Sequence, residues 1–82
     1  MQPAALRNIG RTIRQRRRQA RLSQEALAQA CGLSQTYVSQ VESGARNLSI
    51  LTLLAICRAL ELTPAELLAD FTLPALRRLR LT

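Results

Sequence analysis

The chain has 82 residues and a formal net charge of +7, and 48% of its residues are apolar although only Tyr37 and Phe71 are aromatic. This length accommodates one small domain, whose core must consist of Leu, Ile, Val and Ala. The sequence contains no secretory signal, no membrane-spanning apolar run, no His, no phosphate-binding glycine motif and no paired carboxylates. We therefore expect a cytoplasmic protein that is not an enzyme and holds no metal or cofactor.

The positive charge is concentrated at the two ends of the chain. Residues 1–21 contain seven arginines and no acidic residue, residues 22–70 are net negative, and residues 71–82 add three arginines. A basic block beside a nearly neutral body favours a polyanion as the partner, because counterion release contributes to the affinity. The alternative is a solvated arginine-rich face.

The first half of the chain predicts two amphipathic helices. Apolar residues at helical spacing place the first over residues 4–19. Its inner face is formed by Leu6, Ile9, Ile13 and Ala20. Ser23 is a suitable N-cap for the second helix, which Gly32 ends. Its inner face is formed by Leu27, Ala28 and Cys31. Cys31 and Cys57 lie in no C-x-x-C pair, so we interpret both as small buried hydrophobes.

A tight turn, Gly32-Leu33-Ser34, leads to a third helix over residues 35–43. Ser34 caps this helix, and Gly44 ends it in a left-handed conformation. Val38 and Val41 face the core. Two short helices joined in this way predict a helix-turn-helix, which directs the third helix outwards.

The outward face of the third helix carries side chains suited to reading bases. They are Gln35, Thr36, Ser39 and Gln40. Gln can bind adenine through two hydrogen bonds, and Thr offers a hydroxyl group and a methyl group to thymine. The alternative is an ordinary polar helix face. The turn spacing favours insertion into the major groove of double-stranded DNA.

Two further helices complete the predicted body. Ser49 caps a helix over residues 50–60, and Thr63 caps one over about residues 64–70, with Pro64 at its first position. The sequence thus predicts an all-α, compact five-helix bundle containing a helix-turn-helix. The predicted domain covers residues 1–70, and residues 71–82 form a basic C-terminal tail. In the tail, Pro74 can begin a short helix, whereas residues 79–81 alternate like a strand.

The fourth helix is apolar on more than one side. Its inner stripe is Ile50, Leu53, Ile56, Cys57 and Leu60. A helix that is apolar on two faces is expected to be buried on two faces. We therefore predict a homodimer, with recognition helices about 34–36 Å apart on a pseudo-palindromic operator. The predicted interface residues are Leu51, Leu54, Leu68 and Phe71. The alternative is a monomer in which residues 71–82 cover this surface.

The stretch LSQEALAQACGLSQTYVSQVESGARNLSILTLLAICRALELTPAELL resembles the Cro/repressor-type, or XRE, helix-turn-helix family, and the similarity covers roughly residues 6–69. The resemblance implies a lambda-repressor-like DNA-binding domain of bacterial or phage type, acting at the nucleoid. It implies that Gln24 bonds a phosphate, and that Gln35, Thr36, Ser39 and Gln40 face bases. Arg17 and Glu42 match a structural ion pair between the first and third helices; a phosphate contact by Arg17 is the alternative.

A narrower resemblance links two segments to the controller proteins of restriction–modification systems. The segments are residues 36–39 and residues 42–49. The resemblance implies a dimer that activates or represses its own operon. It also implies that Thr36, Tyr37 and Ser39 lie at the DNA, and that Arg46 and Asn47 hold the DNA backbone or an adjacent base. The position of Tyr37 beside Thr36 favours a phosphate contact through its hydroxyl group. Tyr37 can alternatively be a packing residue. Many controllers carry Arg where this chain has Gln35, so the resemblance does not imply which base is read at that position.

The rival functions involve protein partners. An adaptor of the same fold would dock its arginine-rich first helix on an acidic protein, as coactivator-type members of the family do. An antitoxin would repress its operon and bind a toxin through residues 71–82. RNA polymerase is a further expected partner of an activator. The polar run Gln35–Gln40 favours the operator-binding regulator.

Overall fold

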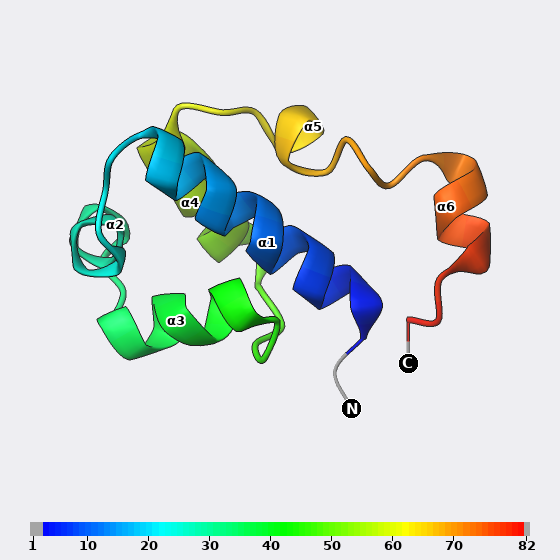
Figure 1. Cartoon of the computed structure of the whole chain (residues 1–82), viewed down its shortest axis with the longest axis horizontal. Helices are drawn as coiled ribbons and strands as arrows, with labels where there is room; N and C mark the ends of the chain where they lie inside the picture. The colour runs from blue at the N-terminus through cyan, green and yellow to red at the C-terminus, as the bar shows by residue number, and fades with distance from the viewer. Residues whose placement is uncertain (1–2, 82) are drawn as a thin grey trace.

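A computed structural model describes residues 3–81, which form six helices and no strand. The helices are α1 (Ala4–Gln19), α2 (Gln24–Cys31), α3 (Gln35–Ser43), α4 (Ile50–Leu60), α5 (Pro64–Leu67) and α6 (Leu73–Arg78). Helices α1 to α5 form one body, and α6 stands apart from it (Figure 1). The all-α class and the positions of the first four predicted helices are confirmed. None of the helices between residues 3 and 81 combines the length and apolar character needed to cross a bilayer.

Side-chain caps explain where the helices begin. The hydroxyl oxygens of Ser23, Ser34 and Ser49 each accept a hydrogen bond from the backbone N–H three residues later, at 3.0–3.1 Å. Thr63 does the same for Glu66, whose carboxylate accepts from the Thr63 N–H in return. Hydrogen bonds from the Thr63 backbone and hydroxyl lower the pKa of Glu66. These caps satisfy N–H groups that have no partner within their helix.

The core is built from aliphatic side chains, as the composition predicts. Its fully buried members include Ile13, Leu27, Val38, Val41, Ile56 and Leu67. Cys57 is also buried, and Cys31 is half-buried with its Sγ 3.7 Å from the carbonyl oxygen of Ala55. Burial raises the pKa of both thiols. Both cysteines therefore lie where a small apolar residue fits.

Helix α1 crosses α3 so closely that its backbone meets the backbone of α3. A Cβ atom at Gly10 would overlap the carbonyl oxygens of Val41 and Glu42. Gly44, which ends α3 with φ +82°, also leaves little room for a Cβ atom, which would lie 2.7 Å from Arg7 Cγ. The apolar stripe of the first helix did not include Gly10, because a glycine contributes nothing to hydropathy. This close crossing fixes α3 against α1.

Three features of the sequence prediction are wrong. Ile50 is 72% exposed because it begins α4 one turn before Leu53, where the helix enters the core. Ala20 is exposed because it is the C-cap of α1. The fifth helix ends at Leu67 rather than near residue 70, since residues 69–70 have no core to pack against. A sixth helix exists because Thr72 caps it and Pro74 occupies its first turn.

The C-terminal tail is therefore partly helical. Leu79 follows α6 with an extended backbone, but the strand-like alternative for residues 79–81 fails because no described strand pairs with it. Helix α6 buries none of its own residues. Residues 1, 2 and 82 of the predicted domain and tail lie outside the described residues.

Candidate nucleic-acid interface

Helices α2 and α3 form a helix-turn-helix. Gly32 ends α2 with φ +69°, which favours glycine, and the Leu33 N–H donates to the Ala28 carbonyl oxygen at 2.8 Å. Ser34 then caps α3 immediately. Ala28 and Val38 are buried between the two helices. The turn is therefore short and fixed at both ends, and it sets α3 on the edge of the body (Figure 1).

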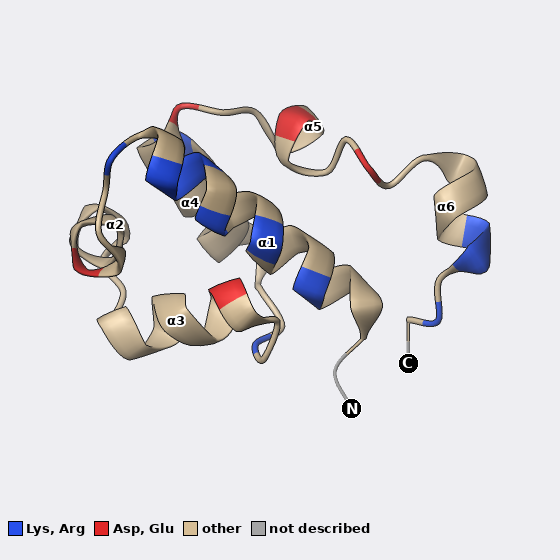
Figure 2. Ribbon diagram, in the orientation of Figure 1, with Lys and Arg blue, Asp and Glu red and all other residues tan. Residues whose placement is uncertain are grey.

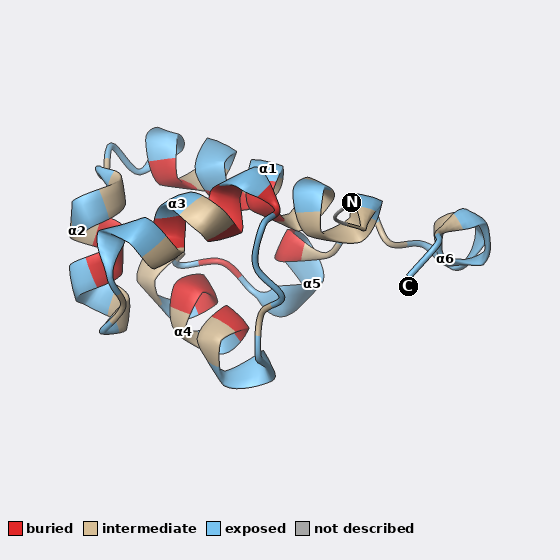
Figure 3. Ribbon diagram, turned by 90° about the horizontal axis from the view of Figure 1, so that it is seen from below, coloured by how far each residue is buried: buried red, intermediate tan, exposed pale blue. Residues whose placement is uncertain are grey.

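The first turns of α3 present polar side chains to solvent. Gln35, Thr36 and Ser39 are exposed, and Figure 3 shows the exposed side of α3 facing outwards from the bundle. None of the three side chains forms a hydrogen bond within residues 3–81, so their donors and acceptors are available to a ligand. An amide followed by two hydroxyl groups on one helix face can form hydrogen bonds with base edges in a major groove.

Gln40, the fourth predicted base contact, lies in a different setting. It is half-buried, and its Oε1 accepts a hydrogen bond from Arg46 Nε at 2.9 Å. The Arg46 guanidinium also lies over the ring of Tyr37, 5.1 Å from its centroid, in a cation–π contact. Gln40, Tyr37 and Arg46 thus form one polar cluster, which we call the loop clamp, between α3 and the loop that follows it. Asn47 is exposed in that loop.

The loop clamp was not foreseen from the sequence, although each of its residues was assigned to DNA. Nothing in the sequence indicated that Arg46 would fold back over α3. The clamp orients Arg46 at the C-terminal side of the exposed α3 face, so a phosphate near that face would meet a guanidinium already held in place. The Tyr37 ring packs against the core and under the Arg46 guanidinium, as the packing alternative predicts, and its contact with DNA stays a prediction.

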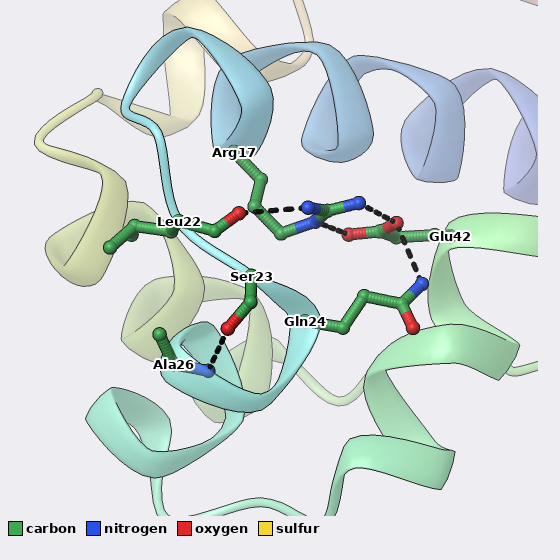
Figure 4. A network of polar contacts seen from close by, with 6 residues as sticks. All are labelled: Arg17, Leu22, Ser23, Gln24, Ala26 and Glu42. Carbon is green, nitrogen blue, oxygen red and sulfur yellow. Dashed lines mark hydrogen bonds and ion pairs between the residues drawn. The ribbon is translucent and has the colours of Figure 1, made fainter.

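A buried ion pair holds α3 against α1 (Figure 4). Arg17 is 8% exposed and Glu42 is 7% exposed. Arg17 Nε donates to Glu42 Oε2 at 2.6 Å, and Arg17 Nη2 donates to Oε1 at 3.0 Å. Arg17 Nη1 donates to the carbonyl oxygen of Leu22 at 2.8 Å. The hydrogen bond with Glu42 raises the pKa of Arg17. Arg17 is thus committed to the fold, which is the role the resemblance implied.

Gln24 joins the same network from the first residue of α2. Its Nε2 donates to Glu42 Oε1 at 3.1 Å, and its amide oxygen is turned away from Glu42 (Figure 4). Because an amide nitrogen carries two hydrogens, Nε2 keeps a second hydrogen for a phosphate. Gln24 therefore braces α3 and can still contact a DNA backbone. One carboxylate, Glu42, links α1, α2 and α3.

The exposed beginning of α4 is strongly apolar. Ile50, Leu51 and Leu54 are 72%, 79% and 44% exposed. Leu51 and Leu54 also line a shallow hollow together with Ala55 and Arg58. Of the other predicted interface residues, Leu68 packs against the core and Phe71 is half-buried. We name Ile50, Leu51 and Leu54 the α4 patch; Leu51 and Leu54 are predicted interface residues, whereas Ile50 was predicted to face the core.

Positive charge covers the side of the body formed by α1. Arginines recur along α1, and the acidic residues lie on other elements (Figure 2). No cluster of His, Cys, Asp and Glu within residues 3–81 could hold a metal ion. The described surface therefore offers a polar helix face, a basic helix and an apolar patch.

Comparison with known proteins identifies the class. The chain belongs to the helix-turn-helix family, whose model matches residues 13–67. Its relatives are regulators rather than enzymes. The control protein C.BamHI of Bacillus amyloliquefaciens is 44% identical over 65 residues, which are 78% of this chain and 79% of that protein.

Two solved structures show the same architecture. The restriction-modification controller protein C.AhdI from Aeromonas hydrophila is similar with a TM-score of 0.76 and 42% identity, over 78% of this chain and 97% of that one. The controller C.Esp1396I, as a tetramer in complex with its natural 35 base-pair operator, gives a TM-score of 0.73 and 30% identity, over 80% of this chain and 87% of that one.

Proposed function

We propose that this protein is a sequence-specific transcription regulator that binds operator DNA with α3 in the major groove. The observation that carries the proposal is the exposed, uncommitted set Gln35, Thr36 and Ser39 on a helix fixed by the buried Arg17–Glu42 pair. A fixed helix with free hydrogen-bonding ends is what direct base readout requires. The helix-turn-helix family and an operator-bound relative support the same function.

Within this proposal the predicted residues divide into two roles. Gln35, Thr36 and Ser39 read base edges, and Gln40 contributes through the loop clamp. Gln24, Tyr37, Arg46 and Asn47 hold the DNA backbone. The contacts of Gln24 and Arg46 support this division, because protein contacts hold both of them while the side chains of the first group are free.

The regulator acts as a homodimer through the α4 patch. Three large apolar side chains that are 44–79% exposed on one helix end would cost free energy in water. Self-association of the patch removes them from solvent and gives a two-fold axis, so that two α3 helices meet one DNA face. The exposed residues of the patch support this assignment; Leu68, already in the core, contributes less.

The regulator works in the bacterial cytoplasm as a controller protein of a restriction–modification operon, including its own gene. The 44% identity to a control protein over four-fifths of its length supports this role. Contact with RNA polymerase, or with a toxin through residues 71–82, stays a prediction from the sequence.

Selection of binding sites from a randomised DNA pool tests this function. We expect the wild-type protein to enrich a pseudo-palindrome with half-sites about 10 base pairs apart, since each half-site receives one α3. The base preferences should persist in competition with unrelated DNA. Enrichment of no sequence, or of a single asymmetric site bound by one protomer, would contradict the proposal.

A further inference from the structure

One feature of the molecule has no part in the function above: a row of arginines on α1. Arg11, Arg14 and Arg18 are spaced three and four residues apart and are all exposed. At 100° per residue they lie within about 60° of one another around the helix, and the row is about 10 Å long. We call these three residues the arginine row.

The arginine row is not explained by the stability of the fold. Within residues 3–81, Arg16 forms an ion pair with Glu66 at 3.8 Å, and Arg17 forms one with Glu42. None of the row residues does. Like charges one helical turn apart destabilise a helix. The row therefore costs the isolated protein free energy that a polyanion would restore.

The position of the row selects DNA as the polyanion. When the molecule is viewed from the side of α3, α1 runs along one edge and α4 lies towards the opposite edge (Figure 3). In a dimer formed through the α4 patch, the two-fold axis passes on the α4 side. The DNA that flanks each half-site, on the side away from the two-fold axis, then passes α1. Gly10, which lies one turn before Arg14 on the same side of α1, sits directly on the α3 backbone, so the row borders α3.

We propose that the arginine row binds the phosphate backbone of the DNA that flanks each half-site, beyond the bases read by α3. This inference rests on the proposed operator binding and dimer. Guanidinium groups pair with phosphates through two parallel hydrogen bonds, and the row presents such a group about once in every helical turn. Contact with flanking DNA favours a duplex that bends towards α1 at its two ends. The contact adds affinity without adding base preference.

The test compares two duplexes that share the selected operator, one with flanks of about 3 base pairs and one with flanks of about 12. The variant is Arg11→Gln/Arg14→Gln/Arg18→Gln. The matched control, Arg77→Gln/Arg78→Gln/Arg80→Gln, removes the same charge from exposed positions in and after α6. Affinities are measured across a range of salt concentrations, and circular dichroism checks that both variants stay helical.

We expect the wild-type protein and the control to bind the long duplex roughly tenfold more tightly than the short one. The row variant should bind the short duplex within about twofold of wild type and lose the gain from the flanks. On the long duplex its salt slope should fall by up to about 5, because six phosphate contacts per dimer are removed at about 0.9 each.

Other results would overturn the inference. Equal losses on both duplexes, or equal losses in the row variant and the control, would mean that only overall charge matters. A wild-type affinity independent of flank length would assign the row to another partner, such as an acidic protein. Either result leaves operator binding by α3 intact, whereas the absence of any selected operator would overturn the proposed function itself.

Discussion

Replacing Glu42 by Ala is expected to lower the free energy of unfolding by about 3–5 kcal/mol, because removing one partner leaves a buried charge uncompensated. Arg17, 8% exposed, would lose two hydrogen bonds, and Gln24 would lose its acceptor. For a chain of this size such a loss approaches the whole stability. Denaturant unfolding at a fixed protein concentration measures it.

A neighbouring variant supplies the control for Glu42. Arg16 pairs with Glu66 at 3.8 Å, and both side chains are well exposed, so Arg16→Gln should cost less than about 1 kcal/mol. The double replacement Arg17→Met/Glu42→Leu should recover much of the loss, since a buried ion pair can be replaced by apolar groups of similar volume. Equal losses for Arg16→Gln and Glu42→Ala would refute the central position of Glu42 in the fold.

Leu51→Glu is expected to turn the dimer into a monomer and to weaken operator binding by about 100-fold or more. A buried carboxylate at the centre of the α4 patch would meet its own copy across the two-fold axis. Loss of the second half-site contact removes the effective concentration that links the two α3 helices. Sedimentation gives the mass, and titration of the operator gives the affinity.

Leu73→Glu is the matched control for the dimer. Leu73 is 59% exposed but lies on α6, away from the α4 patch (Figure 1). It should leave the mass and the operator affinity unchanged. A dimer that persists in Leu51→Glu and dissociates in Leu73→Glu would place the interface on α6 instead.

Local signals allowed most of the helices to be predicted. Ser34, Ser49 and Thr63 fix helix starts by contacts within three residues, which the sequence displays directly. The turn at Gly32 likewise needs only local geometry. The predicted pairing of Arg17 with Glu42 came from resemblance, because 25 residues separate them and no local rule joins them.

The errors in the sequence prediction arose at residues whose burial and contacts depend on the tertiary structure. The helical period placed Ile50 on the inner stripe, but period does not reveal where a helix leaves the body. The end of α5 at Leu67 depends on what the following residues pack against. The loop clamp and the approach of Gly10 to α3 depend on the fold of the whole chain. The exposed polar face of α3 could be predicted from the sequence because the first turn of α3 follows directly from the capped turn.

The central claim is that Gln35 and Thr36 on α3 read bases, and binding-site selection with variants tests it most directly. Gln35→Ala and Thr36→Ala should each lose the preference at one position of both half-sites, at a cost of about 1–3 kcal/mol, and keep the preference elsewhere. Arg46→Ala, which removes a residue of the loop clamp, should lower the affinity for all DNA sequences alike and leave the selected motif unchanged. If all three variants enrich the same motif as wild type, or lose every preference together, α3 does not read the operator in this way.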